Sequence, residues 1–417
     1  MACNDYKLSR RAMMGATSAS ILGFSIRDLL AYSGSDHEAK AEHVILFWNG
    51  GGMSHIDTWD PKPGRPTQGD FSPIATSAPG VQISEIFPKL SKQMHNAALI
   101  RSIAGTQGAH GRASYNLQTS YLPGPNLRHP GVGSVVVHEL NNHSDLPPYI
   151  TISGQAPRAS YLGQKCEAYY VAAPGEKDPY LAFPAGITQV RGDRRLEQLA
   201  KFNQRFLDKK NDTRLTSTQT SIEDAVRLMR SPALEAFELD KVDSKTLERY
   251  GDTNFGRGAL MAKRLVEKGV RFVQVNRGGF DTHSNNFPAM NNHGEVMDPA
   301  LASLVEDLSE SGMLEKTMVI MLSEFGRTPR INDNAGRDHW ASVFSCFMAG
   351  GGIRGGQVIG SSDEDGAMPK DRPVEVADIH ATLCYAMGID HEKEVMTPLL
   401  RPMKLVDNGA PVMELFS

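Results

Sequence analysis

Three continuous apolar runs stand out along the chain, and each ends in glycine or in polar residues. They cover residues 43–48, 270–275 and 317–322. A continuous run of this length is typical of a strand that is buried on both faces, as in a parallel sheet covered by helices. Amphipathic stretches at residues 257–268 and 298–312 lead into the second and third runs. This alternation predicts an α/β fold.

The region from about 192 to 250 has a different pattern, because it is rich in charge and has helical periodicity with few β-branched runs. It predicts either helices packed on the sheet or a helical insertion.

The chain has 417 residues, of which 40% are hydrophobic and 22% charged. These proportions are typical of a globular protein with a sizeable core and exclude a disordered or collagen-like chain. Since no internal repeat divides the sequence, we expect one domain over residues 42–417.

The first 41 residues have the features of an export signal. Arg10 and Arg11 precede an uncharged, mildly apolar stretch at residues 12–26. A basic start, paired arginines and a short apolar stretch are typical of a twin-arginine signal, with an amphipathic N-terminal helix as the alternative. Ala39-Lys40-Ala41 offers a small-x-small cleavage pattern, and residues 31–33 offer a less regular one. We therefore expect the twin-arginine export machinery as a partner and a periplasmic or extracellular location.

Charge and cysteine content narrow the function classes further. The formal net charge is −4, from 44 basic and 48 acidic residues. This balance argues against a nucleic-acid-binding protein whose affinity rests on phosphate neutralisation. The uncharged N-terminal stretch is shorter than the roughly 20 residues of a membrane-spanning helix, so we expect no stable membrane span. Only four cysteines occur, and removal of the signal would leave three, so disulfides are not expected to hold the fold together.

Carboxylates and imidazoles gather where the predicted strands end. Because the carboxyl ends of parallel strands meet at one edge of a sheet, these side chains are expected to lie close together. Asp and Glu neutralise a cation and neutral His donates a nitrogen, which is the mixture that a hydrolytic metal site needs. The candidate metal ligands are Asp57, Asp281, His283, Glu324, Asp338 and His339.

Four motifs give the sequence a specific resemblance. Residues 49–63, 108–115, 323–329 and 336–340 together resemble domain-of-unknown-function family 1501, which is twin-arginine-exported and often labelled sulfatase-like. The likeness runs from about residue 43 to 400. The family is grouped with the alkaline phosphatase and sulfatase superfamily, so the resemblance implies a three-layer fold with a mainly parallel central sheet between helices. It also implies one or two divalent metal ions, with zinc, calcium, magnesium and manganese all open.

The resemblance implies roles for individual residues. Asp281 and His283 resemble the Asp and His of one metal site of the superfamily, and His339 resembles its late His ligand. Glu324 occupies the place of the Asp in the superfamily's Asp-His pair after a strand.

The sequence departs from the superfamily at two ligand positions. Asn49 stands where the superfamily has its first-strand Asp, and Phe325 stands where it has the second member of the Asp-His pair. Asp57 or His55 could compensate from the loop after the first strand.

The nucleophile is not evident from the sequence. Gly108 falls where the modified Cys or Ser of a sulfatase would be, so we do not expect sulfatase chemistry through that residue. Thr106 or Ser102 could substitute, or a metal-bound hydroxide could attack directly. His110 is a candidate ligand or acid/base. Arg112 and Arg327 are candidates for binding an anionic group through a bidentate fork.

Together these features predict an exported, metal-dependent hydrolase of phosphate or sulfate esters or of related small anionic substrates. The competing hypothesis is a non-catalytic binding or surface-assembly protein that retains the fold. The residues Asn49, Gly108 and Phe325 favour the second hypothesis.

Overall fold

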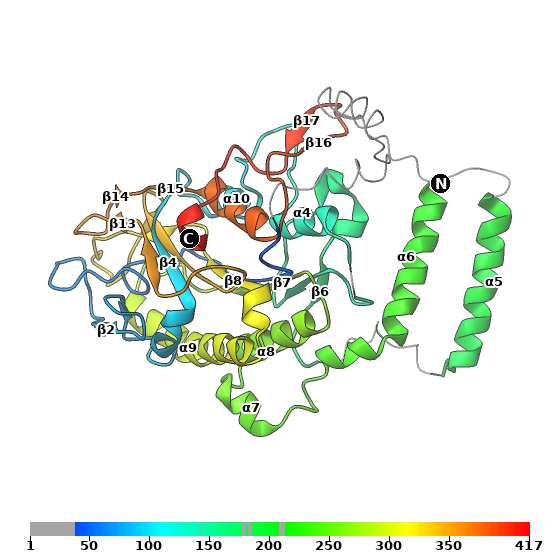
Figure 1. Ribbon diagram of the computed structural model, residues 1–417, viewed down its shortest axis with the longest axis horizontal. Helices are drawn as coiled ribbons and strands as arrows, with labels where there is room; N and C mark the ends of the chain where they lie inside the picture. Colours follow the sequence, from blue (N-terminus) through cyan, green and yellow to red (C-terminus); the bar gives the residue numbers. More distant parts are fainter. Residues whose placement is uncertain (1–37, 143, 177–180, 182–185, 208–212) are drawn as a thin grey trace, which may run out of the picture.

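A nine-stranded sheet forms the centre of the molecule (Figure 1). The computed structural model describes residues 38–142, 144–176, 181, 186–207 and 213–417. The strands follow the order β12-β4-β11-β8-β1-β7-β5-β6, with β15 also paired to β4. Strand β11 is antiparallel to both of its neighbours, and the other pairings in this sheet are parallel. The predicted α/β fold with a mainly parallel sheet is confirmed.

The elements have the following bounds. The strands of the central sheet are β1 (His43–Asn49), β4 (Ala97–Ala104), β5 (Tyr149–Ile152), β6 (Tyr169–Val171), β7 (Phe272–Arg277), β8 (Thr317–Leu322), β11 (Phe344–Ala349), β12 (Gln357–Ile359) and β15 (Val374–Glu375). The helices described below are α3 (His110–Thr119), α4 (Val132–Glu139), α5 (Gln189–Leu207), α6 (Thr213–Arg230), α7 (Ser244–Arg249), α8 (Asn254–Glu267), α9 (Asn286–Glu310) and α10 (Val376–Ala386).

The three predicted strands are adjacent in the sheet. Strand β1 lies between β7 and β8 and is parallel to both, with Val44 paired to Phe272 and Met318. All seven residues of β1 are buried, because helices cover both faces of the sheet. The predicted amphipathic stretches correspond to α8 and α9. Each of these helices begins earlier than its hydrophobic pattern suggested.

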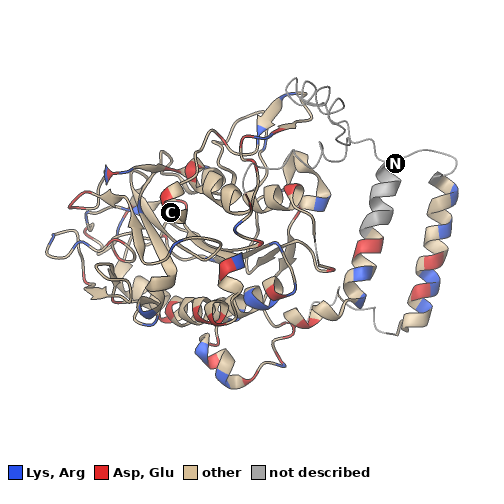
Figure 2. Ribbon diagram, viewed as in Figure 1, with Lys and Arg blue, Asp and Glu red and all other residues tan. Residues whose placement is uncertain are grey.

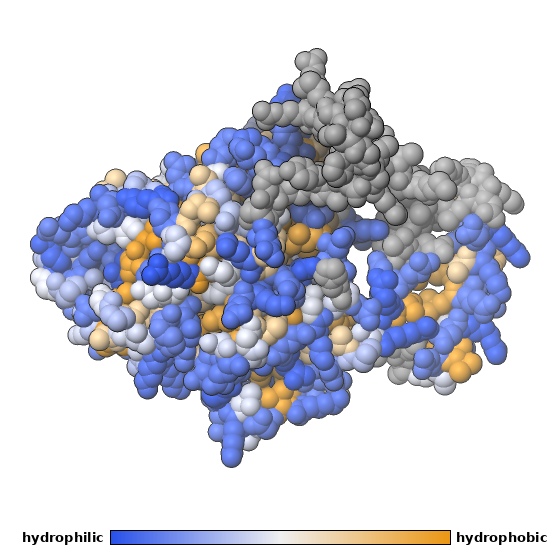
Figure 3. All heavy atoms as spheres, in the orientation of Figure 1, coloured by the Kyte–Doolittle hydropathy of each residue, from blue (hydrophilic) through white to orange (hydrophobic). Residues whose placement is uncertain are grey.

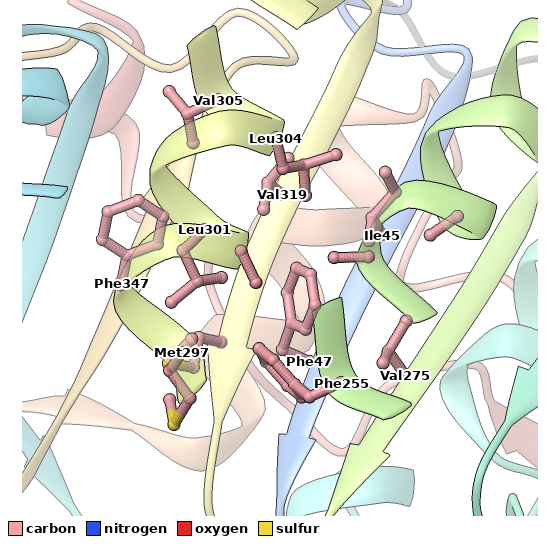
Figure 4. Close-up of a cluster of buried hydrophobic side chains, with 14 of the residues drawn as sticks. Ile45, Phe47, Phe255, Val275, Met297, Leu301, Leu304, Val305, Val319 and Phe347 are labelled. Atoms are coloured by element: carbon pink, nitrogen blue, oxygen red, sulfur yellow. The ribbon is translucent and has the colours of Figure 1, made fainter. Parts of the chain in front are cut away.

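Two hydrophobic layers separate the sheet from its helices. Since successive side chains of a strand point to opposite faces, Ile45 and Phe47 of β1 pack toward α8 and α9, as Figure 4 shows. Val44 and Leu46 belong to a second cluster, which includes residues of α3, α4 and α10. The molecule therefore has the three-layer architecture that the family resemblance implies.

The region from about 192 to 250 forms a helical insertion between β6 and α8. It contains most of α5, then α6, a short 3-10 helix at Pro232–Phe237, and α7. Helices α5 and α6 lie side by side, at a distance from the central sheet (Figure 1). Among the helices of the described residues, none combines the length and the apolar character that crossing a bilayer requires.

Most of the predicted export signal lies outside the described residues, but its last few residues are part of the structure. The backbone N–H groups of Lys40 and Ala41 both donate to the carbonyl of Ala386 at the end of α10, at 2.8 Å. The side chain of Ala41 is buried. Cleavage after Ala41 would remove these contacts, whereas cleavage near residues 31–33 would keep them.

Candidate metal centre

The carboxyl ends of β1, β7 and β8 meet at one edge of the sheet, and the loops that follow them pack on one another. Gly51 follows β1 with φ of +122°, and a Cβ atom there would lie 2.5 Å from the backbone nitrogen of Asp281. Only glycine fits so close an approach at this φ. The side chain of Glu324, which follows β8, accepts a hydrogen bond from the N–H of Gly51 at 2.8 Å. These contacts fix the loops that carry the predicted ligands.

Three imidazoles surround the carboxylate of Asp281. The Nε2 atom of His110, the first residue of α3, lies 3.3 Å from Asp281 Oδ2. The Nε2 atoms of His283 and His339 each lie 3.1 Å from Asp281 Oδ1 and 3.0 Å from one another. We call the side chains of Asp281, His110, His283 and His339 the Asp281 cluster. Its members come from three separate segments of the chain: the start of α3, the loop after β7, and residue 339.

The second nitrogen of each imidazole faces an oxygen that can only accept a hydrogen bond. His110 Nδ1 donates to Glu324 Oε1 at 2.8 Å, and His283 Nδ1 donates to Asp338 Oδ1 at 2.7 Å. His339 Nδ1 donates to the carbonyl of Gly108 at 2.8 Å. A neutral imidazole carries one N–H, so these bonds place the hydrogen on Nδ1 and leave a lone pair on every Nε2. All three lone pairs therefore face the Asp281 carboxylate.

This arrangement favours a proton or a metal ion among these atoms, because electron-rich atoms repel one another at such distances. Ligands bound to zinc at 2.0–2.1 Å in a tetrahedron are roughly 3.3 Å apart, which is close to the observed spacing. Ligand atoms of His110, Asp281 and His339 lie within 4.8 Å of one another. Among the described residues, the buried Nε2 of His110 has no hydrogen-bond partner. The residues thus fit a divalent metal ion.

Arg327 contacts Asp281 from the protein interior and does not face solvent. Its guanidinium is fully buried and donates to Asp281 Oδ1 at 2.6 Å, to the carbonyl of Gly52 at 2.8 Å and to that of Arg337 at 3.1 Å. Burial alone would raise the pKa of Asp281, but the hydrogen bond and the positive charge of Arg327 oppose it, and that pKa lies well below its ordinary value. Asp281 is therefore ionised and available to a cation.

Asp57 lies apart from the Asp281 cluster, in a buried ion pair. Arg337 donates to both of its oxygens, at 2.8 and 3.1 Å, and neither side chain is exposed. Asn286 at the start of α9 donates to the same carboxylate at 2.9 Å. The backbone N–H of Arg337 also donates to the carbonyl of Thr282. This pair joins the loop after β1 to the two loops that carry His283 and His339.

The two remaining candidates flank the beginning of α3, with Thr106 in the preceding loop and Arg112 in the first turn. Thr106 is exposed, and its hydroxyl accepts a hydrogen bond from Gln107 at 3.0 Å. Arg112 is also exposed and donates to the Gln107 side chain at 2.8 Å. Among the described residues, no hydrogen bond or ion pair joins either side chain to the Asp281 cluster. The backbone between them does contact it, through the carbonyl of Gly108.

The two positions that depart from the superfamily are both buried. Asn49 is fully buried, and its Oδ1 atom has no hydrogen-bond partner among the described residues. The ring of Phe325 packs beneath the imidazoles, with its centroid 5.0 Å from that of His110 and 4.6 Å from that of His339. A Cβ atom on Gly52 would lie 2.4 Å from this ring. Phe325 therefore supports the cluster by packing where a ligand was sought.

Three supporting groups were missed in the sequence: Phe325 as a packing surface, the carbonyl of Gly108, and Arg337. The only available signal was the position of Arg337, which directly precedes two predicted ligands in the motif at residues 336–340. Its partner Asp57 is 280 positions away in the chain, so the sequence could not pair them.

Residues 41–416 match the family described as "Protein of unknown function (DUF1501)", so the chain belongs to that family, as its motifs predicted. None of the curated proteins matches the sequence significantly. Among solved structures, the chain is similar to Ps i-CgsB, with a TM-score of 0.41 and 10% identity over 85% of this chain and 73% of that one.

Two further solved structures show a similar partial likeness. The PsFucS1 sulfatase from Pseudoalteromonas sp. has a TM-score of 0.35 and 13% identity, covering 91% of this chain and 72% of that one. The phosphonate monoester hydrolase of Agrobacterium radiobacter has a TM-score of 0.37 and 11% identity, covering 90% and 77%. At these low scores the likeness carries no conclusion about residues or activity.

Proposed function

We propose that this member of the DUF1501 family is an exported, metal-dependent hydrolase of phosphate or sulfate esters or of related small anionic substrates. The observation that supports the proposal is the convergence of three imidazole lone pairs on the ionised Asp281. A cluster of this composition, open to solvent at the carboxyl edge of an α/β sheet, is where such folds bind ligands.

Three side chains of the Asp281 cluster, those of His110, Asp281 and His339, would hold the metal ion, with His283 beside them. Glu324 and Asp338 would orient His110 and His283 through their Nδ1 hydrogens, as carboxylates do for metal-bound imidazoles. Imidazole nitrogens together with one carboxylate favour zinc among the four candidate metals, since calcium and magnesium prefer oxygen ligands. When bound, such an ion supplies polarisation of an ester oxygen and lowers the pKa of water.

The surroundings of the cluster suit an anion. The side chains of Asp281 and His283 are each 47% exposed, so a substrate can approach them from solvent. His110 begins α3, and the N-terminal end of a helix carries partial positive charge. Arg112 in the first turn adds a full charge to the same side. Since Thr106 has no hydrogen bond to an imidazole or carboxylate among the described residues, we favour water over Thr106 as the nucleophile.

Metal analysis and substrate assays test this proposal together. The purified protein is expected to contain zinc or to bind it tightly, and to turn over an aryl phosphate or an aryl sulfate in its presence. Asp281→Asn should lose both properties, whereas Asp365→Asn, an exposed change in another loop, should retain them. Absence of metal binding and of turnover with added zinc, manganese, magnesium or calcium would exclude a metal-dependent hydrolase.

A second candidate, a non-catalytic binding or surface-assembly protein, is favoured by one observation. The fully buried Asn49 has replaced the first-strand Asp, and no hydroxyl bonds to the cluster imidazoles among the described residues. This candidate predicts metal binding without turnover of any ester in the panel. It also predicts that the Asp281→Asn variant still complements a strain from which the gene has been deleted. Loss of complementation together with loss of turnover would instead support the hydrolase.

Export is the remaining part of the proposal. Replacing Arg10 and Arg11 by lysine is expected to retain the protein in the cytoplasm, while Lys7→Gln should not. The N-terminal sequence of the exported protein locates the cleavage site. Because Ala41 is buried and both Lys40 and Ala41 bond to the end of α10, we expect cleavage nearer residues 31–33 than after Ala41.

A further inference from the structure

Helix α5 exposes an unusual amount of apolar surface. Val190 is 68% exposed, Leu199 42%, Phe202 71% and Phe206 53%. Spacings of three and four residues place Leu199, Phe202 and Phe206 along one side of the helix. Large apolar side chains exposed together on one helix are typical of a surface that another body covers.

The same helix is strongly basic (Figure 2). It carries Arg191, Arg194, Arg195, Lys201 and Arg205 against two acidic residues, Asp193 and Glu197. Its formal charge is thus +3 in a chain whose total is −4. Arg195 precedes Leu199 by four residues, and Arg191 precedes Arg195 by four. These two arginines therefore continue the apolar side of α5 toward its N-terminus.

Phe202 and Phe206 do not line the cavity between α5 and its partner helix α6, whereas Leu199 lies at its edge and is among the lining residues. This cavity of about 820 Å³ lies between the two helices, with Leu196, Ala200, Ile222 and Val226 among its lining residues. An ion pair between Asp193 and Arg230 joins the helices. Figure 3 shows hydrophobic residues along this part of the molecule, bordered by hydrophilic ones. Helices α5 and α6 are therefore already packed together, yet Phe202 and Phe206 of α5 remain exposed to solvent.

We propose that α5 docks the protein on the surface of an anionic lipid bilayer. A helix with aromatic and aliphatic side chains on one side and Lys or Arg beside them binds in the plane of the membrane interface. The apolar side chains enter the acyl boundary, and each basic residue near the surface adds attraction to anionic headgroups. This inference concerns a surface distant from the Asp281 cluster and is independent of the hydrolase proposal.

Charge favours a bilayer over a second copy of the chain. Two α5 helices packed in parallel would bring Arg191 and Arg195 of one copy toward those of the other, and in antiparallel packing toward the turn that carries Arg205. Like charges oppose both contacts. A bilayer presents an apolar interior next to anionic groups, so it can accommodate Phe202 and Phe206 together with the arginines. The chain does not need a spanning helix for this mode of binding.

Vesicle sedimentation tests the proposal with the full chain. We expect binding to vesicles of phosphatidylcholine with phosphatidylglycerol, weak binding to phosphatidylcholine alone, and loss of binding as salt screens the charges. Phe202→Ser/Phe206→Ser should lower the partition coefficient by about tenfold or more. Arg191→Gln/Arg195→Gln should lower it by a similar factor. Met396→Ser/Leu399→Ser, which removes two side chains of 54% exposure elsewhere, is the matched control and should change it little.

A spectroscopic measurement separates α5 from the apolar residues 12–26, which could also bind lipid. A tryptophan introduced as Phe202→Trp is expected to be quenched by brominated lipids in anionic vesicles, whereas one introduced as Leu400→Trp is not. Equal quenching at both positions, unchanged partition of the Phe202→Ser/Phe206→Ser variant, or no binding of the unaltered chain would each overturn the proposal. So would a loss of dimerisation in that variant without any change in vesicle binding, because α5 would then be an interface between copies.

Discussion

Two aspartate–arginine pairs lie among the loops at the carboxyl edge of the sheet, and they differ in how far their carboxylates reach solvent. In the pair of Asp57 and Arg337 both side chains are fully buried. In the pair of Asp281 and Arg327 the guanidinium is fully buried, but the carboxylate is 47% exposed. We call the pair of Asp57 and Arg337 the closed pair and the pair of Asp281 and Arg327 the open pair. The same two residue types therefore occupy two different environments within one group of loops.

The difference lies in how much of each carboxylate is engaged. Both oxygens of Asp57 accept hydrogen bonds from Arg337, and Asn286 adds a third. Asp281 receives one bond from Arg327, and its remaining oxygen faces His110. A fully engaged carboxylate stabilises the loops, whereas a partly engaged one can bind a cation. Burial of the carboxylate, rather than residue type, separates the two roles.

The largest expected effect is on stability, from breaking the closed pair. Arg337→Met would leave Asp57 buried without its cation, which typically lowers the free energy of unfolding by about 3–5 kcal/mol. Urea denaturation measures this. Arg65→Met is the control, because Arg65 pairs with Asp365 on the surface and its loss should change little. A small effect of Arg337→Met would mean that solvent reaches Asp57.

A pH effect of similar size on the free energy of unfolding is expected from a buried histidine near the loop that carries Asp281. His293 of α9 donates to the carbonyl of Gly279, accepts from Arg277 and stacks on Phe280. Burial lowers its pKa from 6.5 to about 4. Because the folded pKa is lowered, this contribution is present above pH 6.5 and is lost as the pH falls through about 4, at about 3 kcal/mol.

The variant His293→Gln measures that contribution. Between pH 7 and pH 4.5 its free energy of unfolding should fall by about 2 kcal/mol less than that of the unaltered protein. His380→Gln should behave alike, since burial also lowers the pKa of His380 to about 4. Equal pH dependence of His293→Gln and the unaltered protein would show that His293 titrates normally in the folded state.

The next effect is on metal binding, from changing the open pair. Asp281→Asn keeps a hydrogen-bond acceptor for Arg327 but removes the negative charge, so we expect zinc affinity to fall by about 100-fold or more. Its stability should fall less than that of Arg337→Met. Isothermal titration with zinc and urea denaturation provide the two measurements. If both variants lost stability and metal to the same degree, the distinction between the pairs would fail.

The smallest expected effect comes from a residue that acts through an imidazole. Glu324→Gln retains the shape of the side chain but weakens its hold on the Nδ1 hydrogen of His110. Zinc affinity should fall by about 10- to 100-fold. Glu315→Gln, an exposed change before β8, is the control. An unaltered affinity in Glu324→Gln would indicate that His110 does not bind the metal ion.

Much of the fold could be predicted from the sequence, because buried parallel strands have long apolar runs. Strands β1, β7 and β8 and helices α8 and α9 were found in this way. Strand β4 was not, since Arg101 and Ser102 interrupt its apolar run. The antiparallel direction of β11 depends on its pairing with β4 and β8, which a local pattern does not contain.

The convergence of the loops that carry the candidate ligands was predicted for a related reason. Adjacent parallel strands end at one edge, so the residues after β7 and β8 were expected to meet. Asp281 and His283 lie 3.1 Å apart, and Glu324 is joined to Asp281 through His110. How deeply a side chain at that edge is buried from solvent depends on tertiary packing. Asp57 therefore looked equivalent to Asp281 in the sequence, although the side chain of Asp57 is fully buried and that of Asp281 is 47% exposed.

The central position of β1 also has a consequence for how the chain folds. This strand is made early in synthesis, yet it pairs with β7 and β8, whose residues follow more than 220 positions later. Such non-local pairing gives a high contact order and slow folding. Until residue 277 is available, the run His-Val-Ile-Leu-Phe-Trp at residues 43–48 lacks both neighbours, and until residue 322 it lacks one, so it is prone to aggregate. Chaperone capture of nascent chains should therefore concentrate on this segment.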